Sequence, residues 1–224
     1  MNELDSAIVD LSQLISNVKL PTQLKAQCKI DLGDIYLLKG EPWESTLLYS
    51  QVEKSQHEAP LGYEAKLRNA KLWYYAGDFK RLAEEHLDIL KQATTREIAN
   101  DAMDLSMRIK ENTTFDTTGA ALKEFSSIEL LIYQNKLDDA VKMLDSFDLK
   151  QSPRILDDVY WLEANLLMKQ GKFAESIAKL QRILDEFGDD ILADDAYFLQ
   201  GDIYTLKISS RTKKRLRRYI QRSF

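Results

Sequence analysis

The sequence predicts an all-α fold of stacked antiparallel helix pairs, and three observations support this prediction. The 224 residues include only 8 Gly and 4 Pro, while 30% are charged and 44% are hydrophobic. That balance is typical of a helix-rich chain that can bury a substantial core. The other two observations are an internal repeat of 36 or 37 residues and apolar spacing of helical period within each repeat unit.

The repeat is marked by an anchor position, usually a small residue, followed three positions later by a large residue on the same helix face. The anchors are Gly33, Ala70, Ile128, Ala164 and Gly201. An alignment of residues 98–109 with residues 192–203 adds Met107 as a further anchor. A small anchor lets a neighbouring helix approach closely, so each unit is expected to contain a first helix and a second helix that pack together.

The turns and the second helices complete each unit. Gly40, Asn135 and Gly171 predict left-handed residues that end the first helices. The inward positions of the second helices follow helical spacing and are Ser45, Tyr49, Val52; Leu82, His86, Ile89; Ala140, Leu144, Phe147; and Ser176, Leu180, Ile183. One helical hairpin cannot bury its apolar stripe alone, so we expect the units to stack on one another.

Three stretches carry a resemblance to a known family. "ILADDAYFLQGDIY" and "GKFAESIAKLQRILDEFGDD" resemble tetratricopeptide repeats, in a long-period variant similar to that of bacterial outer-membrane assembly lipoproteins and cell-division coordinators. "DLGDIYLLKGEPWESTLLYSQVEK" is similar to repeats in large tetratricopeptide proteins of Bacteroidetes. The resemblance covers residues 2–206 and implies a right-handed α-α superhelix. It also implies a non-enzymatic scaffold that binds a protein or peptide in a concave groove.

The repeat register divides the chain into parts. Residues 1–111 are expected to form an N-terminal stack that opens on an unpaired second helix. Residues 112–118, "NTTFDTT", form an irregular turn, because a second helix is lacking here and the next anchor comes early. Residues 119–206 are expected to form a C-terminal stack.

Residues 207–224 form a basic tail that departs from the repeat. Residues 203–224 hold eight basic residues and no acid, so a chain of net charge -5 carries -13 (-5 less +8) outside them. Lys213 and Arg217 stand where a second helix should place a small and an apolar residue. Two interpretations stay open: a non-native end in a fragment of a larger array, and a natural basic tail or polar cap.

The tail also suggests an alternative function, nucleic-acid binding. The acidic body would oppose the approach of a polyanion. Nucleic acid is therefore the less favoured partner.

The concave groove that the resemblance implies is lined by first-helix residues. By position these are Leu67, Lys71, Tyr74, Tyr75, Phe125, Tyr133, Trp161, Asn165 and Phe198. Within "WYY" (73–75), three consecutive helical residues span about 200°, so we expect Trp73 to face the core and the tyrosines to face the groove. Exposed aromatic side chains suit a protein or peptide ligand. The alternative is that these rings pack between neighbouring first helices.

Little in the sequence indicates catalysis, a cofactor or a metal. His57 and His86 lack companions at triad or metal-ligand spacing, and Cys28 is expected to be a small buried residue. The acids of residues 185–195 do not follow an EF-hand pattern and suit a helix N-terminus. We therefore expect no enzyme and no cofactor.

The sequence also bears on membranes and export. No stretch approaches the roughly 18 apolar residues of a membrane span, so no transmembrane segment is expected. The acidic start does not resemble a signal peptide. The compartment stays undetermined: cytoplasmic for the chain as written, or envelope-associated for a piece of an exported parent.

Overall fold

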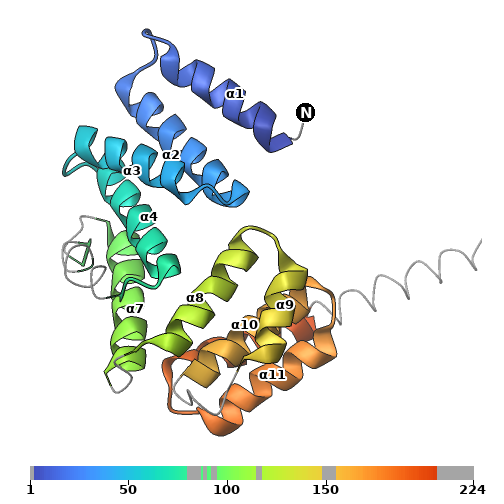
Figure 1. Ribbon diagram of the computed structural model, residues 1–224. Helices are drawn as coiled ribbons and strands as arrows, with labels where there is room; N and C mark the ends of the chain where they lie inside the picture. The colour runs from blue at the N-terminus through green and yellow to red at the C-terminus, as the bar shows by residue number, and fades with distance from the viewer. Residues whose placement is uncertain are drawn as a thin grey trace, which may run out of the picture. The chain divides into compact units, whose positions relative to one another are not determined.

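The computed structural model describes residues 3–79, 87, 90–91, 95–114, 118–147 and 155–205. Over these ranges the chain forms helices and turns and no strand, which confirms the all-α class. The chain divides into two compact units, residues 1–147 (unit 1) and residues 148–224 (unit 2). Figure 1 follows the helices in chain order.

Unit 1 opens with helices that each contact the next along the chain. They are α1 (Glu3–Ser16), α2 (Thr22–Lys39), α3 (Pro42–Ser55) and α4 (Pro60–Ala76). Gly40 ends α2 at φ +85° and accepts the left-handed conformation without a Cβ penalty. Its N–H donates to the Leu37 carbonyl at 3.0 Å, which satisfies one of the last carbonyls of the helix.

The predicted helix pairing is clearest between α2 and α3. Ser45, Tyr49 and Val52 of α3 are fully buried, as their spacing predicts. A Cβ on the anchor Gly33 would lie 2.5 Å from Cε1 of Tyr49, so only glycine allows this approach. The Ser45 hydroxyl donates to the Gly33 carbonyl at 2.8 Å. The anchor and the second helix therefore meet in the predicted register.

The remaining helices of unit 1 are α7 (Arg96–Thr113), α8 (Ala120–Tyr133) and α9 (Leu137–Ser146). α8 contacts α4 as well as α7 and α9. The Gln134 side-chain amide donates to the Leu37 carbonyl at 3.0 Å, which ties the end of α8 to the end of α2. α8 thus packs back on α4 within unit 1, which ends at Phe147.

The predicted anchor Met107 is not covered by a second helix in the described part of the chain. Met107 of α7 is 39% exposed, whereas Ala102, Leu105 and Ile109 are the buried residues of that helix. Among the described helices, α7 contacts α4 and α8 and has no second helix of its own over the anchor face. An anchor is buried only where its second helix covers it.

Unit 2 repeats the paired arrangement. Its helices are α10 (Leu156–Lys169), α11 (Phe173–Glu186) and a further helix over 191–205. The Ser176 hydroxyl of α11 donates to the carbonyl of the anchor Ala164 at 2.7 Å, as Ser45 does to Gly33 in unit 1. Asp194 lies in the first turn of helix 191–205, where the helix dipole favours a carboxylate, as predicted.

Other expectations have mixed outcomes. Asn135 and Gly171 adopt positive φ after their helices, as predicted. Cys28 is half-buried, not fully buried. The predictions for Leu82, His86 and Ile89 and for the basic tail over 207–224 lie outside the described residues. Within the described part of the chain, no helix has the length and apolar character of a bilayer span.

Candidate functional site

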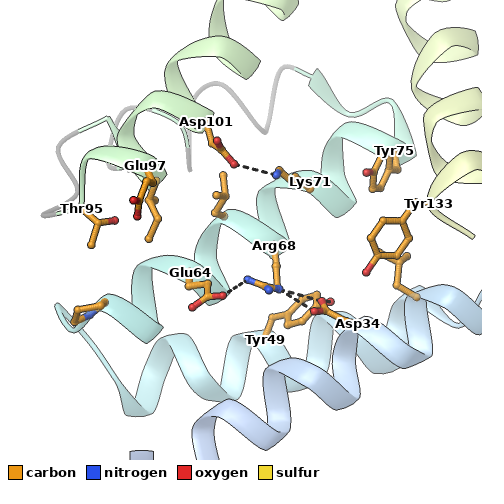
Figure 2. A pocket seen from close by; sticks show the side chains of 14 residues that line it. Asp34, Tyr49, Glu64, Arg68, Lys71, Tyr75, Thr95, Glu97, Asp101 and Tyr133 are labelled. Carbon is orange, nitrogen blue, oxygen red and sulfur yellow. Dashed lines mark hydrogen bonds and ion pairs between the residues drawn. The ribbon is translucent and has the colours of Figure 1, made fainter. Parts of the chain in front are cut away.

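A groove of about 520 Å³ opens on unit 1 among side chains of α2, α3, α4, α7 and α8. Figure 2 shows Arg68 and Lys71 in the middle of the groove, Tyr75 and Tyr133 at one end, and Thr95 and Glu97 at the other. α4 contributes the most lining residues, which are Pro60, Glu64, Leu67, Arg68, Lys71 and Tyr75. Three or four residues separate most of them, so one face of α4 forms the floor.

A hydrogen-bonded cluster fixes the centre of this floor. The Tyr49 hydroxyl donates to Oδ1 of Asp34 at 2.6 Å, and Nε of Arg68 donates to the same oxygen at 3.0 Å. Nη1 of Arg68 also donates to Glu64 at 2.7 Å. Burial lowers the pKa of Arg68, but Asp34 and Glu64 outweigh that effect and raise the pKa overall. The guanidinium therefore stays charged and links α4 to α2.

A second ion pair joins α4 to α7. Nζ of Lys71 lies 3.2 Å from Oδ2 of Asp101, and both side chains are roughly half exposed. Such a pair adds little to stability. Its consequence is local, because it places fixed charges along the groove wall beside Glu97.

The tyrosine end of the groove is formed by Tyr75 of α4 and Tyr133 of α8. Their ring centroids lie 6.5 Å apart at an interplanar angle of 41°. Burial, followed by the nearby Asp34 carboxylate, raises the pKa of Tyr133 to about 12. Burial also raises the pKa of Tyr75. Both phenols are therefore neutral near pH 7, and their rings offer an apolar surface with a polar tip.

The structure brings four of the nine predicted groove residues into this site. They are Leu67, Lys71, Tyr75 and Tyr133. All four come from helices that meet in unit 1, so they form one continuous lining.

Two further predicted residues lie in unit 1 but are packed. Tyr74 is 3% exposed, and its ring lies 5.8 Å from those of Tyr75 and Phe79. Phe125 is buried beneath the Arg108 guanidinium, 5.8 Å from its ring centroid. This corrects the expectation that they face the groove: α7 and α8 both pack against α4, and the two rings are buried in that packing.

The last three predicted residues belong to unit 2. Trp161 is half-buried against the core of that unit, and Asn165 donates its amide to the Trp161 carbonyl at 2.9 Å. Phe198 is exposed on helix 191–205. None of the three lines the groove of unit 1.

The sequence interpretation missed the charged floor. Asp34 stands one position after its anchor, and Arg68 stands two positions before the next anchor. Consecutive first helices lie side by side here, so opposite charges at these two positions meet across the groove. Tyr49 was expected only as a core residue, yet its hydroxyl reaches Asp34. Charge pairing between neighbouring repeats was the signal that could have found this cluster.

Comparisons with protein-family models, with curated proteins and with solved structures find no match for this chain. The chemistry of the groove is therefore interpreted from its own geometry.

Proposed function

We propose that the chain is a non-enzymatic interaction scaffold and that the groove of unit 1 binds a peptide segment of a partner protein. The proposal includes a tetratricopeptide-type right-handed superhelix as the arrangement of the helix pairs. The observation that carries the proposal is the groove itself, an open floor with neutral tyrosine rings at one end and fixed charges along its length.

The lining charges favour a basic partner. The groove is lined by the carboxylates of Asp34, Glu64, Glu97 and Asp101 and by the cations of Arg68 and Lys71. Four acids against two bases leave an excess of two negative charges. A lysine or arginine side chain of a ligand would be attracted to this excess and could also stack on a tyrosine ring. The expected ligand is a peptide with a basic residue next to an apolar one.

The cationic side chains of the groove are already held in place in the free protein. Arg68 and Lys71 are already held by carboxylates of α2, α4 and α7. Groups that are fixed in the free protein lose less conformational entropy on binding. Tyr75 and Tyr133 supply large contact area with few rotatable bonds, as binding anchors often do.

Selection from a displayed random-peptide library on the full chain would test the proposal. We expect enrichment of sequences that place a basic residue beside an apolar or aromatic one. Tyr75→Ala and Tyr133→Ala should each weaken the selected peptide roughly tenfold while leaving the helical content unchanged. Trp43→Ala is the matched control, because Trp43 is 83% exposed on α3 and does not line the groove.

Unchanged affinity in both tyrosine variants would refute the groove assignment. Nucleic-acid binding by residues 207–224 stays the alternative, and those residues lie outside the described part of the chain. Competition with a single-stranded RNA oligonucleotide distinguishes peptide binding in the groove from nucleic-acid binding by the tail. It should not displace the selected peptide if the acidic groove is the peptide site.

A further inference from the structure

The groove of unit 1 has one lining carboxylate, that of Glu97, for which the described residues provide no cation. The two lining cations are paired with the other three lining carboxylates, as Arg68–Asp34 at 3.0 Å, Arg68–Glu64 at 2.7 Å and Lys71–Asp101 at 3.2 Å. Within the described part of the chain, Glu97 is exposed and forms neither an ion pair nor a side-chain hydrogen bond. The neighbouring Arg96 does not line the groove. One of the two excess negative charges of the groove therefore lies at Glu97.

The helix register explains why Glu97 lacks a partner. Glu97 and Asp101 are four residues apart on the groove face of α7. Leu67 and Lys71 have the same spacing on the groove face of α4, and Lys71 pairs with Asp101. Figure 2 shows Glu97 on the side of Asp101 that lies away from the tyrosines. One turn from the Lys71–Asp101 pair, α4 therefore supplies the apolar Leu67 where a second cation would be needed.

The groove beside Glu97 suits a lysine or arginine side chain of a ligand. Leu67 and Ile98 line the groove there with apolar surface, along which the methylene stem of such a side chain packs. The hydroxyl oxygen of Thr95, at the same end, is buried and has no hydrogen-bond partner among the described residues. A cationic head carries several N–H donors, which the Glu97 carboxylate and the unused lone pairs of Thr95 accept.

We infer that Glu97 is the specificity-determining residue of the groove and that it binds the cationic head of one lysine or arginine of the peptide. The inference rests on the proposed function and names the residue that recognises the basic side chain. An acidic side chain of a ligand is disfavoured at this position, because both lining cations are already paired with carboxylates. The apolar residue of the peptide then lies towards Tyr75 and Tyr133.

Parallel selections from one displayed random-peptide library test this inference on the full chain. The wild-type chain should enrich lysine and arginine, whereas the Glu97→Lys chain should lose that enrichment and favour aspartate and glutamate. Glu175→Lys is the matched control. Glu175 is likewise an exposed acid in the first turn of a helix, α11, and its replacement changes the net charge equally. The control chain should therefore select the same basic peptides as the wild type.

Fluorescence anisotropy with two peptides gives the magnitudes. One peptide is the most enriched wild-type sequence, and the other carries glutamate in place of its basic residue. Glu97→Gln removes the charge and should weaken the basic peptide roughly threefold, and Glu97→Lys adds repulsion and should weaken it roughly tenfold. The Glu97→Lys chain should prefer the glutamate peptide. Circular dichroism checks the helical content, and Glu97→Gln decides the test if the Glu97→Lys chain loses helix.

Each other outcome has a distinct meaning. An unchanged preference for the basic peptide in both Glu97 variants would overturn the inference. An equal loss of preference in the Glu175→Lys chain would also overturn it, because the acidity of the whole chain would then attract the peptide. Failure of the proposed function is a different result, namely unchanged affinity in Tyr75→Ala and Tyr133→Ala. Weaker binding in these tyrosine variants without any effect at Glu97 would keep the groove as the peptide site and refute only the role of Glu97.

Discussion

Two glycines at the same repeat position are expected to respond in opposite ways to the same substitution. Gly33→Ala places a methyl group 2.5 Å from Cε1 of Tyr49. The ring cannot easily move, because it is 1% exposed and its hydroxyl is bound to Asp34 at 2.6 Å. Among the described residues, Gly201→Ala meets no neighbouring atom within 4 Å.

The magnitudes follow from overpacking and helix propensity. Inserting a methyl into a filled core costs about 1–3 kcal/mol, and replacing a helical glycine by alanine returns up to about 1 kcal/mol. Gly33→Ala should therefore lower the free energy of unfolding by about 1–2 kcal/mol, whereas Gly201→Ala should raise it by up to about 1 kcal/mol. The sign of the change depends on whether a second helix covers the anchor.

Urea unfolding followed by tryptophan fluorescence measures both changes. Trp43 and Trp73 report on unit 1, and Trp161 reports on unit 2. Replacing the tryptophans of the other unit by phenylalanine isolates each signal. Changes of the same sign in the two variants would refute the account of anchor packing.

Three further predictions rest on single contacts. Ser176→Ala removes the buried hydrogen bond to the Ala164 carbonyl. In urea unfolding, this change should lower the unfolding free energy of unit 2 by about 1 kcal/mol. An unchanged free energy would mean that the bond adds no stability. Asp34→Asn leaves Arg68 with one carboxylate and should destabilise unit 1 by about 1–2 kcal/mol in the same assay, with Glu175→Gln on α11 as a control of no effect. The pKa of Tyr133 is raised from 10.0 to about 12, so the stability that its neutral phenol contributes is present below pH 10 and is lost as the pH rises through 12. Tyr133→Phe should make the thermal midpoint fall less steeply over that window, and an identical fall in both proteins would contradict the raised pKa of the Tyr133 phenol.

Local repeat spacing predicted the helix pairs well, because the contacts within a pair depend only on residues close in sequence. Ser45 and Ser176 both occupy the position twelve after an anchor, and both donate to the anchor carbonyl. Gly40 and Gly171 both end their first helices in the left-handed conformation. Predicting these features required no information about how one helix pair packs against the next.

The groove was only partly predictable, because its shape depends on where α8 packs. A regular stack would leave one face of α4 open, and the predicted groove residues followed that assumption. α8 instead contacts α4, which buries Tyr74 and brings Tyr133 beside Tyr75. The path of the chain after the break in the repeat determines this packing, and helical periodicity holds no information about that path.

Hydrogen–deuterium exchange of the full chain, with and without the selected peptide, tests the binding role of the groove most directly. The account predicts slower exchange in residues 60–76 and 120–133, which carry the floor and the tyrosine end of the groove. Protection confined to unit 2, or to α1 and α3, would contradict it.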